Sequence, residues 1–177
     1  MKARKHTYDT SEENNPFILQ EAAVAYNTVA GADCKTNPFE ILGIKREPDD
    51  LDEAKNTLSV ISYIRKGLPK KALDHLAETA GFTGAEIASI VHTSERTLRR
   101  YTPGQKLNTE QTERIIELAF LYSKGAAVFE DLEQFKIWMD SPIGALGDQK
   151  PKTFLDTSMG IQFLTEELGR IEHGIFA

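Results

Sequence analysis

Regular apolar spacing in this chain of 177 residues follows the period of an α-helix wherever a period can be read. The clearest example lies near the end of the chain, where a 3-4-3 spacing puts four side chains on one helix face: Ile161, Leu164, Leu168 and Ile171. Alternating Val, Ile and Thr residues are nowhere sustained, and no Asn-Gly or Asp-Gly hairpin signal occurs. The pattern therefore predicts an all-α fold.

Capping signals divide the chain into separate helices. The segment from Pro48 to Lys66 has acidic residues in its first turn and basic residues in its last, which suits the helix dipole. Gly174 stands where a glycine would end the last helix. The expected helices are 17–30, 48–66, 69–80, one begun by Thr83, 95–101, one begun by Thr109 and one ended by Gly174, with a short apolar turn over 39–43.

Composition limits the kind of protein. A hydrophobic content of 40% is sufficient for a packed core, and no apolar run approaches the roughly 20 residues that span a membrane. The first residues lack the apolar stretch of a signal peptide, and the one cysteine, Cys34, excludes an internal disulfide framework, so a cytoplasmic protein with no membrane contact is expected. A formal net charge of −6 is unfavourable for a chain that coats nucleic acid, but it allows a local basic patch.

Residues 83–101 predict two short helices joined by a tight turn, which is a helix-turn-helix unit. Thr83 and Glu86 have the spacing of a capping box at the start of the first helix. Ala88 is small enough to let the two helices cross closely, and Leu98 is placed to anchor the second helix to the first.

The second helix of this unit carries clustered cations. In a recognition helix the first residues face base edges, while flanking cations reach phosphates. We expect the groove side to be formed by Ser94, Glu95, Arg96, Thr97, Arg99 and Arg100, with Lys106 following in the loop. A basic run on a short helix is also compatible with an ordinary solvated face. His92 departs from the common pattern, because it occupies the turn position usually filled by glycine, and a positive φ is uncommon for other residues.

Beyond Gly125 the chain predicts a second, smaller helical module. Phe135 and Trp138 lie at helical spacing, and the simplest interpretation is that both are core residues. The module ends in an apolar tripeptide, Ile175-Phe176-Ala177, where chain ends are usually polar and mobile. Such an end is expected either to pack into its own core or to contact a partner.

An ordered string of residues in this module carries a resemblance to a known family. The string is Phe129, Trp138-Met139, Ala145-Leu146-Gly147, Pro151, Leu155-Asp156-Thr157, Gly160, Leu168-Gly169-Arg170-Ile171 and His173-Gly174-Ile175-Phe176. It resembles the toxin-binding domain of the Xre/MbcA/ParS antitoxins, and the helix-turn-helix resembles the Xre-type DNA-binding part of the same proteins. The departures from the family pattern are Met139, where leucine is usual, Asp148-Gln149-Lys150, in a loop often richer in glycine, and His92.

The resemblance implies both a domain division and a function. The domains are a partly helical N-terminal extension over 1–54, a helix-turn-helix DNA-binding domain over 55–123 and a small helical toxin-binding domain over 124–177. The function is that of a type II antitoxin, whose C-terminal end shields the active site of a RES-domain toxin that consumes NAD+. In that family the pair also represses its own operon by binding operator DNA. Carried over to this chain, the toxin-binding residues are Arg170, His173, Gly174, Ile175, Phe176 and Ala177, supported by Trp138 and Pro151.

Two other classes of function are alternatives. Catalysis is not expected, since the 4 histidines lie in unrelated contexts and no phosphate-binding loop, catalytic triad or His-Glu-x-x-His motif occurs, so neither a metal nor a cofactor is implied. A free-standing transcriptional regulator that uses its C-terminal domain only to dimerise is the second alternative. A homodimer is expected in any case, because helix-turn-helix units read half-sites in pairs, but the sequence does not indicate the dimer surface.

Overall fold

The computed structural model describes residues 37–45 and 53–174, and the side chains of 53–56 are excepted. Within these residues the fold is all-α with no β-strand, which confirms the predicted class. The elements are α2 (Pro38–Ile41), α3 (Glu53–Lys66), α4 (Lys70–Ala80), α5 (Gly84–Ile90), α6 (Glu95–Arg100), α7 (Thr109–Val128), α8 (Leu132–Asp140), the 3₁₀ turns η2 (Gly144–Leu146) and η3 (Pro151–Phe154), and α9 (Ser158–Glu172). The predicted helix over 17–30 and the first turn of the helix predicted from Pro48 lie outside the described residues.

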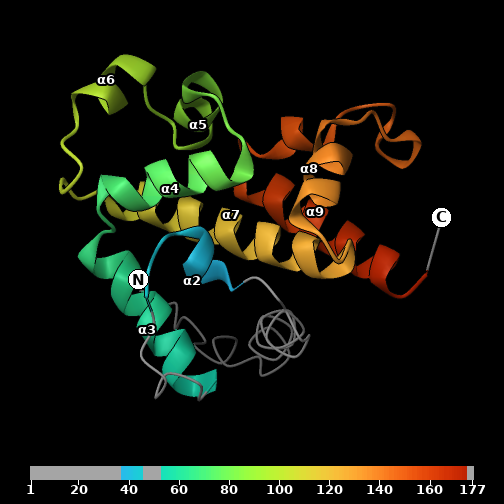
Figure 1. The fold of residues 1–177 in the computed structure, drawn as a ribbon, viewed down its shortest axis with the longest axis horizontal. Coiled ribbons are helices and arrows are strands. Elements are labelled where there is room, and N and C mark those ends of the chain that lie inside the picture. The colour runs from blue at the N-terminus through green and yellow to red at the C-terminus, as the bar shows by residue number, and fades with distance from the viewer. Residues whose placement is uncertain (1–36, 46–52, 175–177) are drawn as a thin grey trace, which may run out of the picture. The chain divides into compact units, whose positions relative to one another are not determined.

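The longest of the described helices, α7, runs through the middle of the unit formed by Asp33–Ala177 (Figure 1). Its start is fixed by a capping box in which the Asn108 side chain accepts from the Gln111 amide and the Gln111 side chain accepts from the Asn108 amide. Most of its circumference is buried, and α2, α3, α4, α8 and α9 all pack against it. The domain boundary predicted near Ser123–Gly125 falls inside α7, which is continuous there.

The helices on the N-terminal side of the unit follow their capping signals. Gly81 ends α4 with a φ of 74°, a left-handed conformation that glycine adopts without strain. The predicted apolar turn over 39–43 contains α2, and its side chains Phe39 and Ile41 are buried against the rest of the core. None of the described helices is long and apolar enough to cross a membrane.

The C-terminal module covers the other part of α7. Helix α8 crosses α7 at Gly125, where a Cβ would lie 2.5 Å from the ring of Phe135, so only glycine allows this approach. Helix α9 packs on α7 through the predicted apolar face, in which Leu164 and Leu168 are fully buried. Gly174 follows the last turn of α9 with a φ of 66°, as its position in the sequence predicts.

Candidate functional site

The helix-turn-helix predicted over 83–101 is present as α5, a turn and α6. Thr83 and Glu86 form the expected capping box, in which the Glu86 carboxylate accepts from the Thr83 amide at 2.7 Å. Ala88 and Leu98 are both buried, and the two helices pack against each other, which is consistent with the roles predicted for them. The turn residue His92 has a φ of 51°. This is the left-handed conformation, which is uncommon for residues other than glycine.

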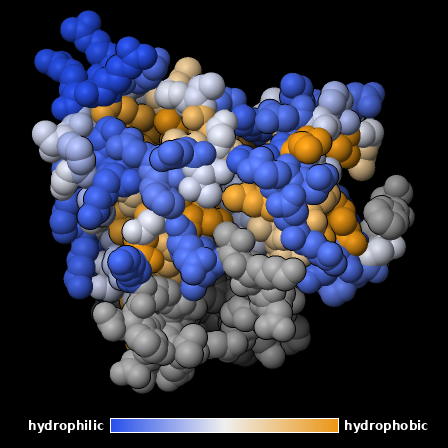
Figure 2. Space-filling model, viewed as in Figure 1, coloured by the Kyte–Doolittle hydropathy of each residue, from blue (hydrophilic) through white to orange (hydrophobic). Residues whose placement is uncertain are grey.

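Helix α6 exposes the three arginines that were predicted to face DNA: Arg96, Arg99 and Arg100. The Ser94 hydroxyl caps the helix by accepting from the Thr97 amide at 3.0 Å, and it also pairs with the Thr97 hydroxyl. Hydrophilic atoms dominate the upper left of Figure 2, where Figure 1 places α6 and its flanking loops. The solvent-exposed face of α6 is therefore polar and carries cationic side chains.

Besides Ser94 and Thr97, three more of the predicted DNA-contacting residues have partners within the protein: Glu95, Arg99 and Lys106. Glu95 forms an ion pair with Arg99 one turn away, and its carboxylate lies against Gly84 at the start of α5. The Lys106 ammonium donates to the main-chain oxygen of Lys66 at 2.8 Å, at the end of α3. The structure thus brings six of the seven residues together on α6 and its cap, and it places Lys106 beside a different helix.

The predicted toxin-binding residues fall into three groups in the C-terminal module. Trp138 is half-buried in an aromatic cluster, and its ring stacks on that of Phe135 at 5.8 Å. Pro151 is buried as the first residue of η3. Arg170, at the end of α9, is exposed and pairs with Glu167 on the same helix, and His173 and Gly174 are also exposed. Residues 175–177 lie outside the described part of the chain.

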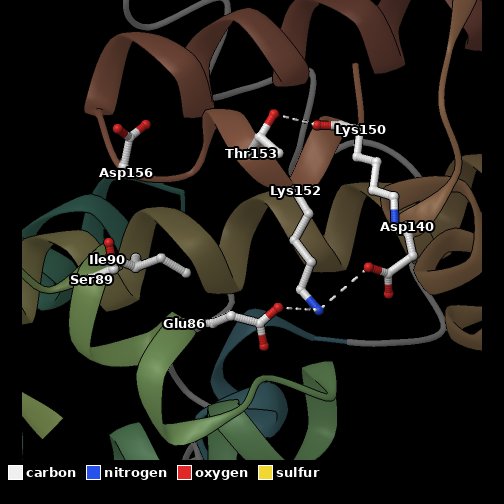
Figure 3. A pocket seen from close by; sticks show the side chains of 8 residues that line it. All are labelled: Glu86, Ser89, Ile90, Asp140, Lys150, Lys152, Thr153 and Asp156. Atoms are coloured by element: carbon white, nitrogen blue, oxygen red, sulfur yellow. Dashed lines mark hydrogen bonds and ion pairs between the residues drawn. The ribbon is translucent and has the colours of Figure 1, made fainter. Parts of the chain in front are cut away.

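A feature that the sequence pattern did not reveal is an open cleft of about 420 Å³ between α5 and the C-terminal module. Lys152, from η3, lies between Glu86 of α5 and Asp140 of α8 (Figure 3). Its ammonium is 3.0 Å from the Glu86 carboxylate and 3.6 Å from that of Asp140. Burial raises the pKa of Glu86, but hydrogen bonds from Thr83 and the charge of Lys152 outweigh burial, so the net pKa is lowered.

The start of α9 is held by a second polar group. The Arg114 guanidinium donates to the Ser158 hydroxyl at 2.9 Å, and that hydroxyl donates to the Glu117 carboxylate at 3.1 Å. Burial raises the pKa of Glu117, although Ser158 and Arg114 partly oppose the shift. These contacts fix the first turn of α9 to α7. Among the described residues, no cluster of His, Cys, Asp and Glu is suited to hold a metal ion.

These features define a class: a helix-turn-helix protein with a small helical domain packed on the same central helix. In a comparison with protein families, two parts of the chain each match a family domain. Residues 59–119 match the antitoxin Xre-like helix-turn-helix domain, and residues 124–174 match the antitoxin Xre/MbcA/ParS C-terminal toxin-binding domain. The chain belongs to the Xre antitoxin family.

Two curated relatives agree with this assignment. The chain is 30% identical over 120 residues to "Antitoxin Xre" of Yersinia enterocolitica, an alignment that covers 67% of this chain and 81% of the relative. It is 29% identical over 116 residues to "Antitoxin Xre" of Photorhabdus laumondii, covering 64% of this chain and 78% of that one. A chain in the crystal structure of the M. tuberculosis MbcT-MbcA toxin-antitoxin complex is 26% identical with a TM-score of 0.45, and the match covers 61% of this chain and 96% of that chain.

Proposed function

We propose that this protein is the antitoxin of a type II toxin–antitoxin pair. Its C-terminal domain would bind a RES-domain toxin that consumes NAD+ and shield its active site, and its helix-turn-helix would repress the operon of the pair. The observation that carries this proposal is the match of residues 124–174 to a toxin-binding domain, because that range contains the module formed by α8, η3 and α9. The protein itself would have no catalytic role.

The geometry of α9 supports a blocking role for the residues at its end. The helix is fixed to α7 by buried Leu164 and Leu168, so side chains on its last turn are held in place by the helix when they dock. Arg170 and His173 are exposed on that last turn. The ion pair of Arg170 with Glu167 is exposed, so breaking it costs little free energy. Arg170 could then pair with a carboxylate or phosphate site on a partner instead. In this proposal Phe176 supplies the apolar anchor.

The exposed arginines of α6 support the repressor role. Arg96 and Arg100 have side chains in solvent on a helix whose other face is anchored by Leu98. That arrangement suits a helix that enters the major groove and contacts base edges and phosphates. We propose that a homodimer binds two half-sites of the operator, in the cytoplasm, where the operator DNA lies.

Removal of residues 175–177 is expected to abolish neutralisation of the toxin. The truncated chain keeps α9 and its packing on α7, so the loss would be specific to the blocking contact. The measurement is the growth of cells that express the product of the neighbouring gene, which under this proposal is expected to be the RES-domain toxin, together with either the full or the truncated chain. Co-purification of that protein with the full chain is the first step of the experiment.

Operator retardation in a gel shift is the matched control for the truncation. It should be unchanged, which would show that the truncated chain is folded. Equal survival with the full and truncated chains would contradict the blocking role, and it would favour a free-standing regulator whose C-terminal domain only dimerises.

The double variant Arg96→Ala, Arg100→Ala is expected to weaken operator binding about 30-fold or more, because each arginine contact to a base edge contributes at least about 1 kcal/mol. An arginine that contacts a phosphate instead of a base edge should lower the slope of log K against log salt by about 1 when it is replaced. A matched control removes the same charge elsewhere: Arg65→Ala with Lys71→Ala, both exposed on α3 and α4. If both double variants weaken binding equally, α6 is not the reading helix.

A further inference from the structure

Helix α5 is attached to the C-terminal domain at both of its ends. In its first turn, Glu86 pairs with Lys152, whose side chain is 15% exposed. The Lys152 ammonium also lies 5.3 Å from the centroid of the Phe82 ring, just before α5. A lysine of the C-terminal domain thus contacts both an acidic and an aromatic side chain of the helix-turn-helix domain; Figure 3 shows the contact with the acidic one, Glu86.

Beyond the other end of α5, the turn residue His92 reaches the same domain. Its Nε2 lies 2.7 Å from the main-chain oxygen of Asp156, and its Nδ1 lies 3.3 Å from the carboxylate of Glu110 on α7. Asp156 directly precedes Thr157, the residue that caps α9. The turn between α5 and α6 is therefore hydrogen-bonded to the base of the last helix.

Between these two attachments the surfaces are separated. The cleft of about 420 Å³ is lined by Ser89 and Ile90 of α5 and by Thr153 on the opposite side. The cleft thus separates α5 from the C-terminal domain between its two ends, and the side chains of Lys152 and His92 connect the two sides at η3 and at Asp156; Figure 3 shows the Lys152 contact. Loss of either contact would change the angle of α5 relative to the C-terminal domain. Because α6 packs on α5, α6 would be displaced with it.

The residue type at the turn supports a role for the His92 contact. The φ of 51° is a conformation that glycine adopts freely and that a histidine adopts with strain. Backbone geometry alone would thus be satisfied better by glycine. The imidazole nitrogens lie within hydrogen-bond distance of Asp156 and Glu110, two residues outside the turn, and glycine could not make these contacts.

We propose that Lys152 and His92 are positioning residues for DNA reading, which set the orientation of α5 and α6 relative to the toxin-binding domain. The proposal rests on the proposed repressor function. A partner that moves η3 or the base of α9 would change the affinity for DNA through these contacts. By thermodynamic linkage, DNA would then change the affinity for that partner by the same factor.

Three variants of the full chain test the proposal. His92→Gly removes the ring contacts but leaves a residue suited to the turn, and Lys152→Met removes the charge but keeps the side-chain length. Lys152→Arg keeps the charge and is the rescue variant. Lys150→Met is the matched control, since Lys150 is an exposed lysine that lines the same cleft.

Two readouts separate positioning from folding. Hydrogen–deuterium exchange of the α5 and α6 amides should accelerate in His92→Gly and Lys152→Met, while exchange in α7 stays as in the wild type. Binding to the DNA fragment directly upstream of the coding sequence should weaken about fivefold or more in the same two variants. Lys152→Arg and Lys150→Met should behave as the wild type in both measurements.

The proposal is overturned if His92→Gly and Lys152→Met exchange and bind DNA as the wild type does. It is also overturned if α6 exchanges faster but the affinity for DNA is unchanged, because the contacts would then be structural only. If the wild-type chain does not bind the fragment at all, the repressor role fails, and the exchange data alone decide whether the two residues orient α5.

Discussion

Gly160→Ala is expected to lower the free energy of unfolding by about 3 kcal/mol or more, one of the largest single effects in this chain. Gly160 lies in the first turn of α9, and a Cβ there would collide with the main-chain oxygen of Phe154. That oxygen belongs to the backbone of η3, so it cannot rotate aside as a side chain can. The 3.0 Å hydrogen bond from the Gly160 amide to the Thr157 hydroxyl would be displaced with it.

Urea unfolding followed by circular dichroism measures this change, and Gly144→Ala is its control. Gly144 lies in the same domain and has no positive φ, and a methyl group added there would meet no other part of the chain within 4 Å. The alanine at this position should therefore alter stability by no more than about 0.5 kcal/mol. Equal midpoints for the two variants would show that η3 and α9 are not in close contact at Gly160.

The parts of the fold that depend on local chemistry could be predicted from the sequence. The capping box of Thr83 and Glu86, the glycine at 174 and the apolar face of α9 each involve residues within one or two helical turns. Their geometry follows from helix periodicity and from the unpaired amides of a helix end. The same reasoning predicts the positions of the two helices of the helix-turn-helix and the burial of Leu98.

The contacts between the modules could not be predicted in this way. Lys152 meets Glu86 and Asp140 only because η3 folds back over the end of α8, and no period or cap in the sequence specifies that path. The position of His92 marks it as unusual, but its bond to Asp156, 64 residues away, depends on the tertiary structure. The contacts that connect the helix-turn-helix to the C-terminal domain are therefore visible only in three dimensions.

Phe135→Ala is expected to destabilise the chain by about 3–5 kcal/mol. The ring is fully buried at the crossing of α7 and α8. It packs edge-on against Tyr122 at 5.1 Å and stacks on Trp138 at 5.8 Å, so its removal leaves a cavity and ends both aromatic contacts. The measurement is again urea unfolding. A loss below about 1 kcal/mol would contradict the central place of this ring in the core.

Gly125→Ala should reveal the same contact from the other helix. Alone it should destabilise, because its methyl group would lie 2.5 Å from the Phe135 ring, which outweighs the gain in helix propensity from replacing glycine. In the Phe135→Ala background the methyl group enters the vacated space, so the double variant should be more stable than the sum of the single effects predicts, by about 1 kcal/mol or more. Gly144→Ala combined with Phe135→Ala should be additive. Additivity of the Gly125 pair as well would mean that α7 and α8 do not cross at these two residues.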